Sequence, residues 1–283
     1  MSWTNFFNQN KSTLNSYDEM ELKIKEFIKS DADVNYKDLK GKTALHLASE
    51  KGYATVVEIL IKNGAKVNDI EGWYKTPLHL ASERGHTTVV EILIRNRAEV
   101  NVKDGLGKTP LHYASEEGHL KVANILIENG AKVNDVDGWN KTPLHYASKK
   151  GSSEIVVLLI IKGARVNVRD GFGETPLHYA SGQGFPTIVK ILLGDFADGY
   201  IDGYADGRAV VDAKNFGKNT PLHLACIENN FEIVKILVKN GSCLDSCNED
   251  FYTPEDLTSD KEIKDYLSNA EKTMEKENSI SCF

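Results

Sequence analysis

Apolar and polar positions alternate along this 283-residue chain in blocks that fit pairs of short helices. Segments such as VVEILIKNGAKVN (residues 56–68) and VVEILIRNRAEVN (89–101) carry apolar side chains at the three- and four-residue spacing of an amphipathic helix. A shorter helix is predicted before each one, with Thr as its N-cap and in most copies Pro at its first position. Nine residues after that Thr comes a residue such as Gly52, which predicts a left-handed helix end. Each unit therefore predicts a helix, a Gly turn, a second helix and a polar excursion.

One short element marks the start of every unit. It reads TALHLA, TPLHLA or TPLHYA, and its first five copies are 33 residues apart. A sixth copy follows after 45 residues, and a degenerate copy, TPEDL, comes 33 residues later. The threonines that begin these copies are Thr43, Thr76, Thr109, Thr142, Thr175, Thr220 and Thr253. A fixed period of this length indicates an array of stacked units.

The 33-residue period and the T-P-L-H-x-A element resemble the ankyrin repeat, over about residues 10–267. The resemblance implies an all-α fold: an ankyrin-repeat α-solenoid of helix pairs with β-hairpin fingers and a concave face. The apolar pattern agrees with it, because one unit of this size cannot bury its apolar side alone whereas stacked neighbours can.

The repeat register also predicts the boundaries of the units. We expect an N-terminal capping unit at 1–38, a truncated C-terminal capping repeat at 249–267 and a polar, acidic, disordered tail at 268–283. Between the caps we expect six repeats, at 39–71, 72–104, 105–137, 138–170, 171–215 and 216–248. The fifth repeat carries a 12-residue insertion near 194–208. Arg97 stands where other units have Gly, so we predict a local weak point there.

The positions of the His, Cys and Asp residues give little support for a catalytic or metal-binding site. All eight histidines belong to the repeat, six of them in the TPLH element, where the resemblance implies structural hydrogen bonds. Cys243 and Cys247 lack a third and fourth ligand at zinc spacing. The insertion holds four aspartates, but their four-residue spacing does not match a calcium loop. We expect no catalytic residue, no metal and no cofactor.

Net charge indicates the class of partner that we expect, and the apolar segments indicate the cellular location. The net charge is −7, and residues 249–283, with ten acidic residues and four lysines, account for −6 of it. The neutral main body argues against nucleic acid as the partner. No export signal and no apolar run of roughly 18 residues is apparent, so we expect no membrane insertion and a cytoplasmic location. Frequent Lys, Asn and Ile suggest an A+T-rich genome; from an intracellular bacterium, such a protein would be a candidate secreted effector delivered into a host cell.

The predicted finger tips carry the main candidate binding residues. Three residues before successive TPLH threonines stand Trp73, Leu106, Trp139 and Phe172. Large apolar side chains at exposed turns indicate a hydrophobic ridge for a partner. In the alternative interpretation, each ring lies sideways on the neighbouring finger and only stiffens the row.

Two groups of tyrosines are further candidates. Tyr113, Tyr146 and Tyr179 follow their threonines by four residues, where the resemblance implies the inner helix face; they could equally be partly buried packing residues. Tyr200 and Tyr204 lie in the insertion, among Gly and Asp, a mixture suited to adaptable contacts. A local duplication without function is the alternative for that loop.

These observations predict a non-catalytic protein–protein interaction scaffold that binds another protein through its concave face and finger tips. The partner cannot be named from the pattern. One alternative is a calcium-responsive regulator or an enzyme that uses the Asp-rich insertion. Another is a structural, self-associating repeat protein, although we expect a monomer.

Overall fold

The computed structural model describes residues 3, 17–29, 33–194 and 207–280. The chain forms two compact units, Met1–Gly138 and Trp139–Phe283. The described residues fold into helices joined by loops, as the all-α prediction requires.

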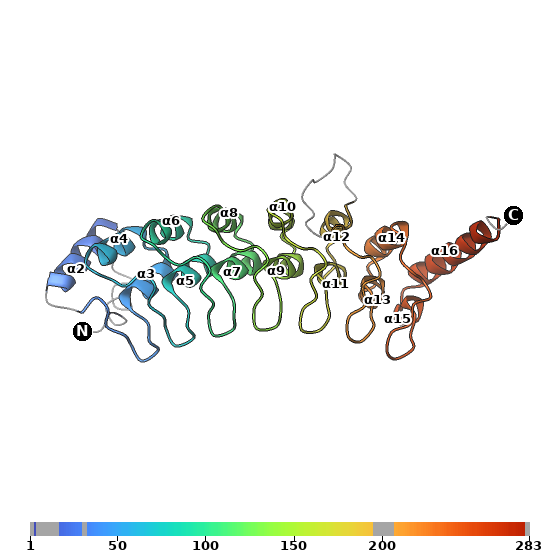
Figure 1. Ribbon diagram of the computed structural model, residues 1–283, viewed down its shortest axis with the longest axis horizontal. Helices are drawn as coiled ribbons and strands as arrows, with labels where there is room; N and C mark the ends of the chain where they lie inside the picture. The colour runs from blue at the N-terminus through green and yellow to red at the C-terminus, as the bar shows by residue number, and fades with distance from the viewer. Residues whose placement is uncertain (1–2, 4–16, 30–32, 195–206, 281–283) are drawn as a thin grey trace. The chain divides into compact units, whose positions relative to one another are not determined.

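In its described residues, the first unit has an N-terminal helix followed by paired helices (Figure 1). Its elements are α2 (Tyr17–Lys29), α3 (Ala44–Lys51), α4 (Ala54–Lys62), α5 (Pro77–Glu83), α6 (Thr87–Arg95), α7 (Pro110–Glu117) and α8 (Leu120–Glu128). The inner helices α3, α5 and α7 pack side by side in one layer, and α2, α4, α6 and α8 form a second layer against them. The core lies between the two layers, where residues such as Leu45, Leu78 and Leu93 are completely buried.

The second unit repeats this arrangement. Its elements are α9 (Pro143–Lys150), α10 (Ser153–Ile161), α11 (Pro176–Gly182), α12 (Pro186–Leu193), α13 (Pro221–Ile227), α14 (Phe231–Lys239), α15 (Pro254–Leu257) and α16 (Lys261–Ile280). Helices α9, α11, α13 and α15 form the inner layer, and α10, α12, α14 and α16 form the outer one. The last inner helix, α15, is only four residues long.

Helix α16 corrects our expectation for the C-terminus. We expected a disordered tail at 268–283, but α16 continues to Ile280. Ile263 and Leu267 are buried and anchor its first turns. The following residues include the strong helix formers Ala, Glu, Lys and Met, so the helix continues after its apolar anchor ends.

A threonine and a histidine start every full inner helix together. In α3, the backbone N–H of His46 donates to Thr43 Oγ1, and the N–H of Thr43 donates back to His46 Nδ1 at 3.2 Å. This is a capping box in which His takes the place usually held by Glu or Gln. The same box forms at Thr76, Thr109, Thr142, Thr175 and Thr220.

Within each unit, the other ring nitrogen of several of these histidines bonds to the next repeat. Because Nδ1 accepts a hydrogen bond, the proton lies on Nε2, which donates to a backbone carbonyl about one repeat further on. His46 donates to Lys75 O at 3.1 Å and His79 to Lys108 O at 3.1 Å. In the second unit, His145 donates to Glu174 O and His178 to Asn219 O. The TPLH histidine thus joins helix start and neighbouring loop.

The turn after α3 needs Gly for two reasons. Gly52 has φ +76°, which favours Gly, and a Cβ there would lie 2.6 Å from Nδ1 of His86. His86 occupies this space and donates to Glu50 O at 3.1 Å. In the second unit, the ring of Phe185 takes the equivalent place next to Gly151.

Arg97 adopts the left-handed conformation that its alignment with Gly predicts, with φ 69°. We expect Arg97→Gly to raise the free energy of unfolding by about 1 kcal/mol, because the Cβ strain disappears. Arg95→Gly is the matched control, since Arg95 is the last residue of α6 and its replacement should lower the free energy of unfolding by up to about 1 kcal/mol through helix propensity. Urea denaturation measures both changes; a destabilised Arg97→Gly variant would contradict the strain assignment.

The buried histidines predict loss of stability in mild acid. Burial lowers the pKa of His46, His79, His145 and His178 to about 4, whereas an unfolded His titrates near 6.5. Between these values the unfolded chain binds more protons, so stability is complete above about pH 6.5 and falls as the pH is lowered toward 4. Urea midpoints between pH 7.5 and 4.5 should show this decline. A His79→Gln variant keeps a cap donor and acceptor but cannot titrate, so its decline should be shallower; a flat wild-type profile would contradict the account.

Candidate protein-binding surface

Seven five-residue loops, here called fingers 1 to 7, lie between the outer helix of one repeat and the inner helix of the next. They are residues 38–42, 71–75, 104–108, 137–141, 170–174, 215–219 and 248–252. Finger 3 shows their geometry. The N–H of Asp104 donates to Lys108 O at 2.9 Å, and Asp104 Oδ1 accepts the N–H groups of Leu106 and Lys108, both at 2.9 Å. The backbone and side chain of the first residue therefore stabilise the turn by hydrogen bonds to the residues that follow it.

The fingers are turns and not the β-hairpins that the resemblance implies. The described residues of the fingers contain no strand. A loop of five residues with one backbone bond at its base is too short for a ladder.

Backbone hydrogen bonds connect neighbouring fingers at their tips. Gly105 N donates to Trp73 O at 2.9 Å, and Gly171 N donates to Trp139 O at 2.6 Å. A Cβ on Gly105 or Gly171 would lie 3.1 Å from that carbonyl oxygen, so Gly permits the close approach. Each bond holds the backbone of a tip residue in place while its side chain projects outward.

All four predicted tip residues are exposed. The exposed fractions are 69% for Trp73, 38% for Leu106, 46% for Trp139 and 57% for Phe172. Trp73 and Leu106 belong to the first unit, Trp139 and Phe172 to the second. The rings keep much of their surface in water, which a purely stiffening role would not require.

Four further exposed apolar residues lie at finger tips and were not in our prediction. They are Leu39, Tyr74, Phe216 and Phe251, with Phe216 69% and Phe251 85% exposed. Each lies one residue before or after the tip position that we compared between units. Inspection of all three central residues of each finger would have found them.

Two of these aromatic residues lie in strained backbone. Tyr74 has φ 61° and Phe251 has φ 65°, where fingers 1, 3 and 5 have Gly41, Gly107 and Gly173. The left-handed region costs a residue with a Cβ about 1 kcal/mol or more. Neither side chain is buried in return, and strain of this kind is often found at functional sites.

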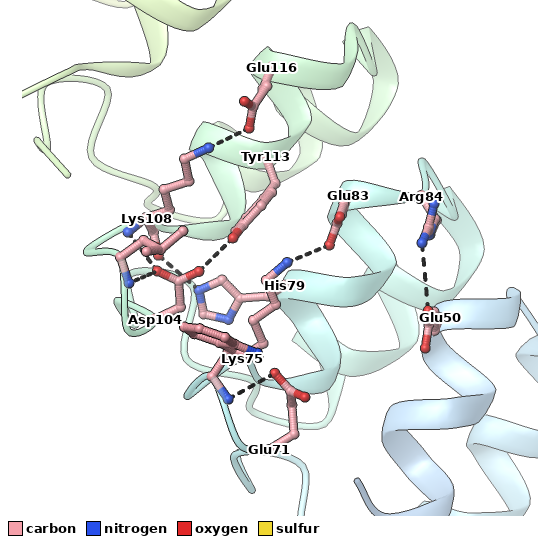
Figure 2. A network of polar contacts seen from close by, with 12 residues as sticks. Glu50, Glu71, Lys75, His79, Glu83, Arg84, Asp104, Lys108, Tyr113 and Glu116 are labelled. Carbon is pink, nitrogen blue, oxygen red and sulfur yellow. Dashed lines mark hydrogen bonds and ion pairs between the residues drawn. The ribbon is translucent and has the colours of Figure 1, made fainter. Parts of the chain in front are cut away.

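Tyr113 lies deeper, in a polar cluster behind finger 3 (Figure 2). It is only 5% exposed, and its hydroxyl donates to Asp104 Oδ2 at 2.6 Å. The ammonium of Lys75 lies 4.1 Å from the ring centroid and is paired with Glu83 Oε2 at 2.8 Å. Burial, followed by the hydrogen bond to Asp104, raises the pKa of Tyr113 far above its ordinary value. The structure therefore places Tyr113 as a brace between inner helix and finger.

The second unit has a similar cluster. Tyr179 is half-buried and donates to Asp170 Oδ2 at 2.7 Å, while Lys141 lies 4.9 Å from its ring centroid. Tyr146 is 7% exposed. Tyr113 and Tyr146 thus fit the packing alternative better than direct contact, and Tyr179 retains some accessible surface.

Tyr200, Tyr204 and the four aspartates of the insertion lie outside the described residues. Within the ranges that are described, no group of three or more His, Cys, Asp or Glu is placed to hold a metal ion. Cys226 is buried, and burial raises its pKa to about 12, which makes it a packing residue.

The stacked helix pairs, their capping boxes and the fingers define a helical repeat protein. A family model described as "Ankyrin repeats (3 copies)" matches residues 68–137 and 144–250, and another, "Ankyrin repeats (many copies)", matches residues 28–81. The chain belongs to the ankyrin-repeat family. Ankyrin repeats generally mediate protein–protein interactions and are typically non-catalytic.

The fold is also similar to solved structures. The crystal structure of the human ASB11 ankyrin repeat domain is 28% identical, with a TM-score of 0.70, and the match covers 81% of this chain and 98% of that one. In total 631 chains of solved structures match, so the likeness defines the fold and not a partner. Comparison with curated proteins gave no match. None of the helices in the described ranges has the length and apolar character to cross a membrane.

The brace formed by Tyr113 can be tested separately from binding. Tyr113→Phe should lower the free energy of unfolding by about 1–3 kcal/mol, because the buried Asp104 carboxylate loses a hydrogen bond. Tyr74→Phe is the matched control: Tyr74 is 59% exposed and should change little. Chemical denaturation compares the two. Equal stability of both variants would contradict the bracing role.

Proposed function

We propose that the protein is a non-catalytic scaffold that binds a partner protein through the finger tips and the adjoining inner-helix face. The observation that carries the proposal is the set of exposed aromatic side chains at the tips, above all Trp73 and Trp139. Trp is enriched among the residues that dominate binding energy at interfaces. Membership of a family that generally binds proteins supports the same function.

The mechanism is preorganisation. Two sets of hydrogen bonds fix the loop backbones before a partner binds. One set runs from loop N–H groups to the side chain of the finger's first residue, as at Asp104, and the other connects the backbones of neighbouring fingers. A partner then does not have to overcome the entropy of ordering these loops, which improves affinity without additional contacts. The proposal includes a monomeric protein acting in the cytoplasm, which the amino-acid pattern suggests.

Affinity capture followed by direct measurement tests this function. A partner recovered from cell lysate and purified should bind a Trp73→Ala, Trp139→Ala variant at least about 30-fold more weakly, equivalent to about 2 kcal/mol, than it binds the wild type. The reason is loss of two exposed anchors with no loss of core packing. Calorimetry gives the affinities.

Leu120→Ala, Ile161→Ala is the matched control, since these residues are also exposed but lie on α8 and α10. It should bind like the wild type, and all three proteins should melt alike. Equal affinity of the tryptophan variant would contradict the finger-tip site. Sedimentation at several concentrations tests the self-associating alternative.

A further inference from the structure

Finger 5, residues 170–174, turns its two carboxylates inward, and finger 6, residues 215–219, contains no acidic residue. The side chain of Asp170 is completely buried, because Oδ1 accepts the N–H groups of Phe172 and Glu174 and Oδ2 accepts the Tyr179 hydroxyl. Glu174 is half-buried and accepts a hydrogen bond from Asn215 Nδ2 at 3.3 Å. Neither acid is therefore freely available on the surface of these fingers.

The exposed charges of the same fingers are positive. Arg169 and Lys214 directly precede fingers 5 and 6, and Lys218 is at the tip of finger 6; all three side chains are exposed. Residues 1–248 carry a net charge of only −1, so these three cations form a local excess of positive charge. Such a surface attracts negatively charged groups.

Cations elsewhere at this position are used inside the protein. Lys37, before finger 1, donates to Ile70 O of the next repeat at 3.0 Å, and Lys103, before finger 3, donates to Val136 O at 2.6 Å. In both cases the equivalent residue of the next repeat is apolar, so a cation alternates with an apolar residue along the row.

Arg169 and Lys214 break this alternation. They occupy equivalent positions before neighbouring fingers, which are joined by the bond from Phe216 N to Phe172 O at 3.0 Å. Over the part of the chain that the structure describes, the Arg169 guanidinium makes no hydrogen bond or ion pair. Two like charges at neighbouring positions repel each other, and a carboxylate placed between them removes the repulsion.

Two aromatic rings accompany these cations. Phe172 and Phe216 are both largely exposed, and Gly173 permits their fingers to approach, since a Cβ there would lie 2.8 Å from Phe216 Cδ1. The rings offer apolar area on the same two fingers that these cations precede, and Arg can bind a carboxylate through two parallel hydrogen bonds.

We propose that fingers 5 and 6 bind an internal acidic segment of a partner protein. Its Asp or Glu side chains pair with Arg169 and Lys214, and Lys218 adds to the attraction. An apolar side chain of the segment packs against Phe172 and Phe216. This inference rests on the proposed scaffold function and specifies the chemistry of the partner.

Fluorescence anisotropy with the full chain tests the proposal. The probe is a labelled peptide (Glu-Glu-Phe)4 with an amidated C-terminus, compared with (Gln-Gln-Phe)4 and with a 12-nucleotide oligouridylate. We expect saturable binding of the acidic peptide and of neither other probe. The affinity for this peptide should be at least tenfold lower for the double variant Arg169→Glu, Lys214→Glu, and also for the single variant Phe216→Ala. Affinity should fall as salt is raised from 50 to 300 mM.

The control variant is Lys121→Glu, Lys162→Glu, which makes the same change in net charge at exposed positions outside the fingers. It should bind like the wild type, and every variant should melt like the wild type. The proposal is overturned if the acidic peptide does not bind, if the control loses as much affinity as the Arg169 variant, or if the glutamine peptide or the oligouridylate binds equally well. If a partner whose binding depends on Trp73 and Trp139 is still found in that case, the scaffold function stands and only the acidic-segment proposal is rejected.

Discussion

Within each of the two compact units, a neutral imidazole joins one repeat to the next. Its Nδ1 caps the inner helix by accepting the N–H of the preceding Thr, and its Nε2 proton binds a carbonyl of the following repeat, as His79 does with Lys108 O. One side chain thus connects the start of a helix, the base of a finger and the neighbouring unit. Glu and Gln can supply the first contact, but a ring with two nitrogens supplies both at once. The cost is sensitivity to acid, because a protonated Nδ1 can no longer accept.

The finger depends on this bond for its position. Lys108, whose carbonyl accepts the hydrogen bond from His79 Nε2, is also the last residue of finger 3, and its N–H donates to Asp104 Oδ1. Asp104 in turn accepts a hydrogen bond from the hydroxyl of Tyr113. The route from the helix cap to the finger tip is therefore a chain of buried hydrogen bonds, and the exposed side chains gain a fixed position without being buried. Burial of each polar group in this chain is tolerated because each has a partner.

Most of the fold could be predicted from the amino-acid pattern because its determinants are local. Thr, Pro and Gly at fixed spacing specify helix starts and ends, and even the left-handed Arg97 followed from its alignment with Gly. The surface was less predictable. Burial of Tyr113 depends on Asp104 in the adjoining finger, and Phe216 and Phe251 lie beside the tip position rather than on it. The helix beyond residue 267 was missed because few large apolar residues follow Leu267, and the buried anchors Ile263 and Leu267 lie near the start of α16.

The central claim is that the fingers are rigid before any partner binds, and amide hydrogen exchange of the free protein measures this directly. The N–H groups of Gly105, Gly171 and Phe216 donate to the preceding finger and should exchange much more slowly than in an unstructured peptide. The N–H of Trp73, bonded only to the Glu71 side chain of its own finger, should exchange faster. Exchange of all these amides at the unstructured rate would contradict a preorganised surface.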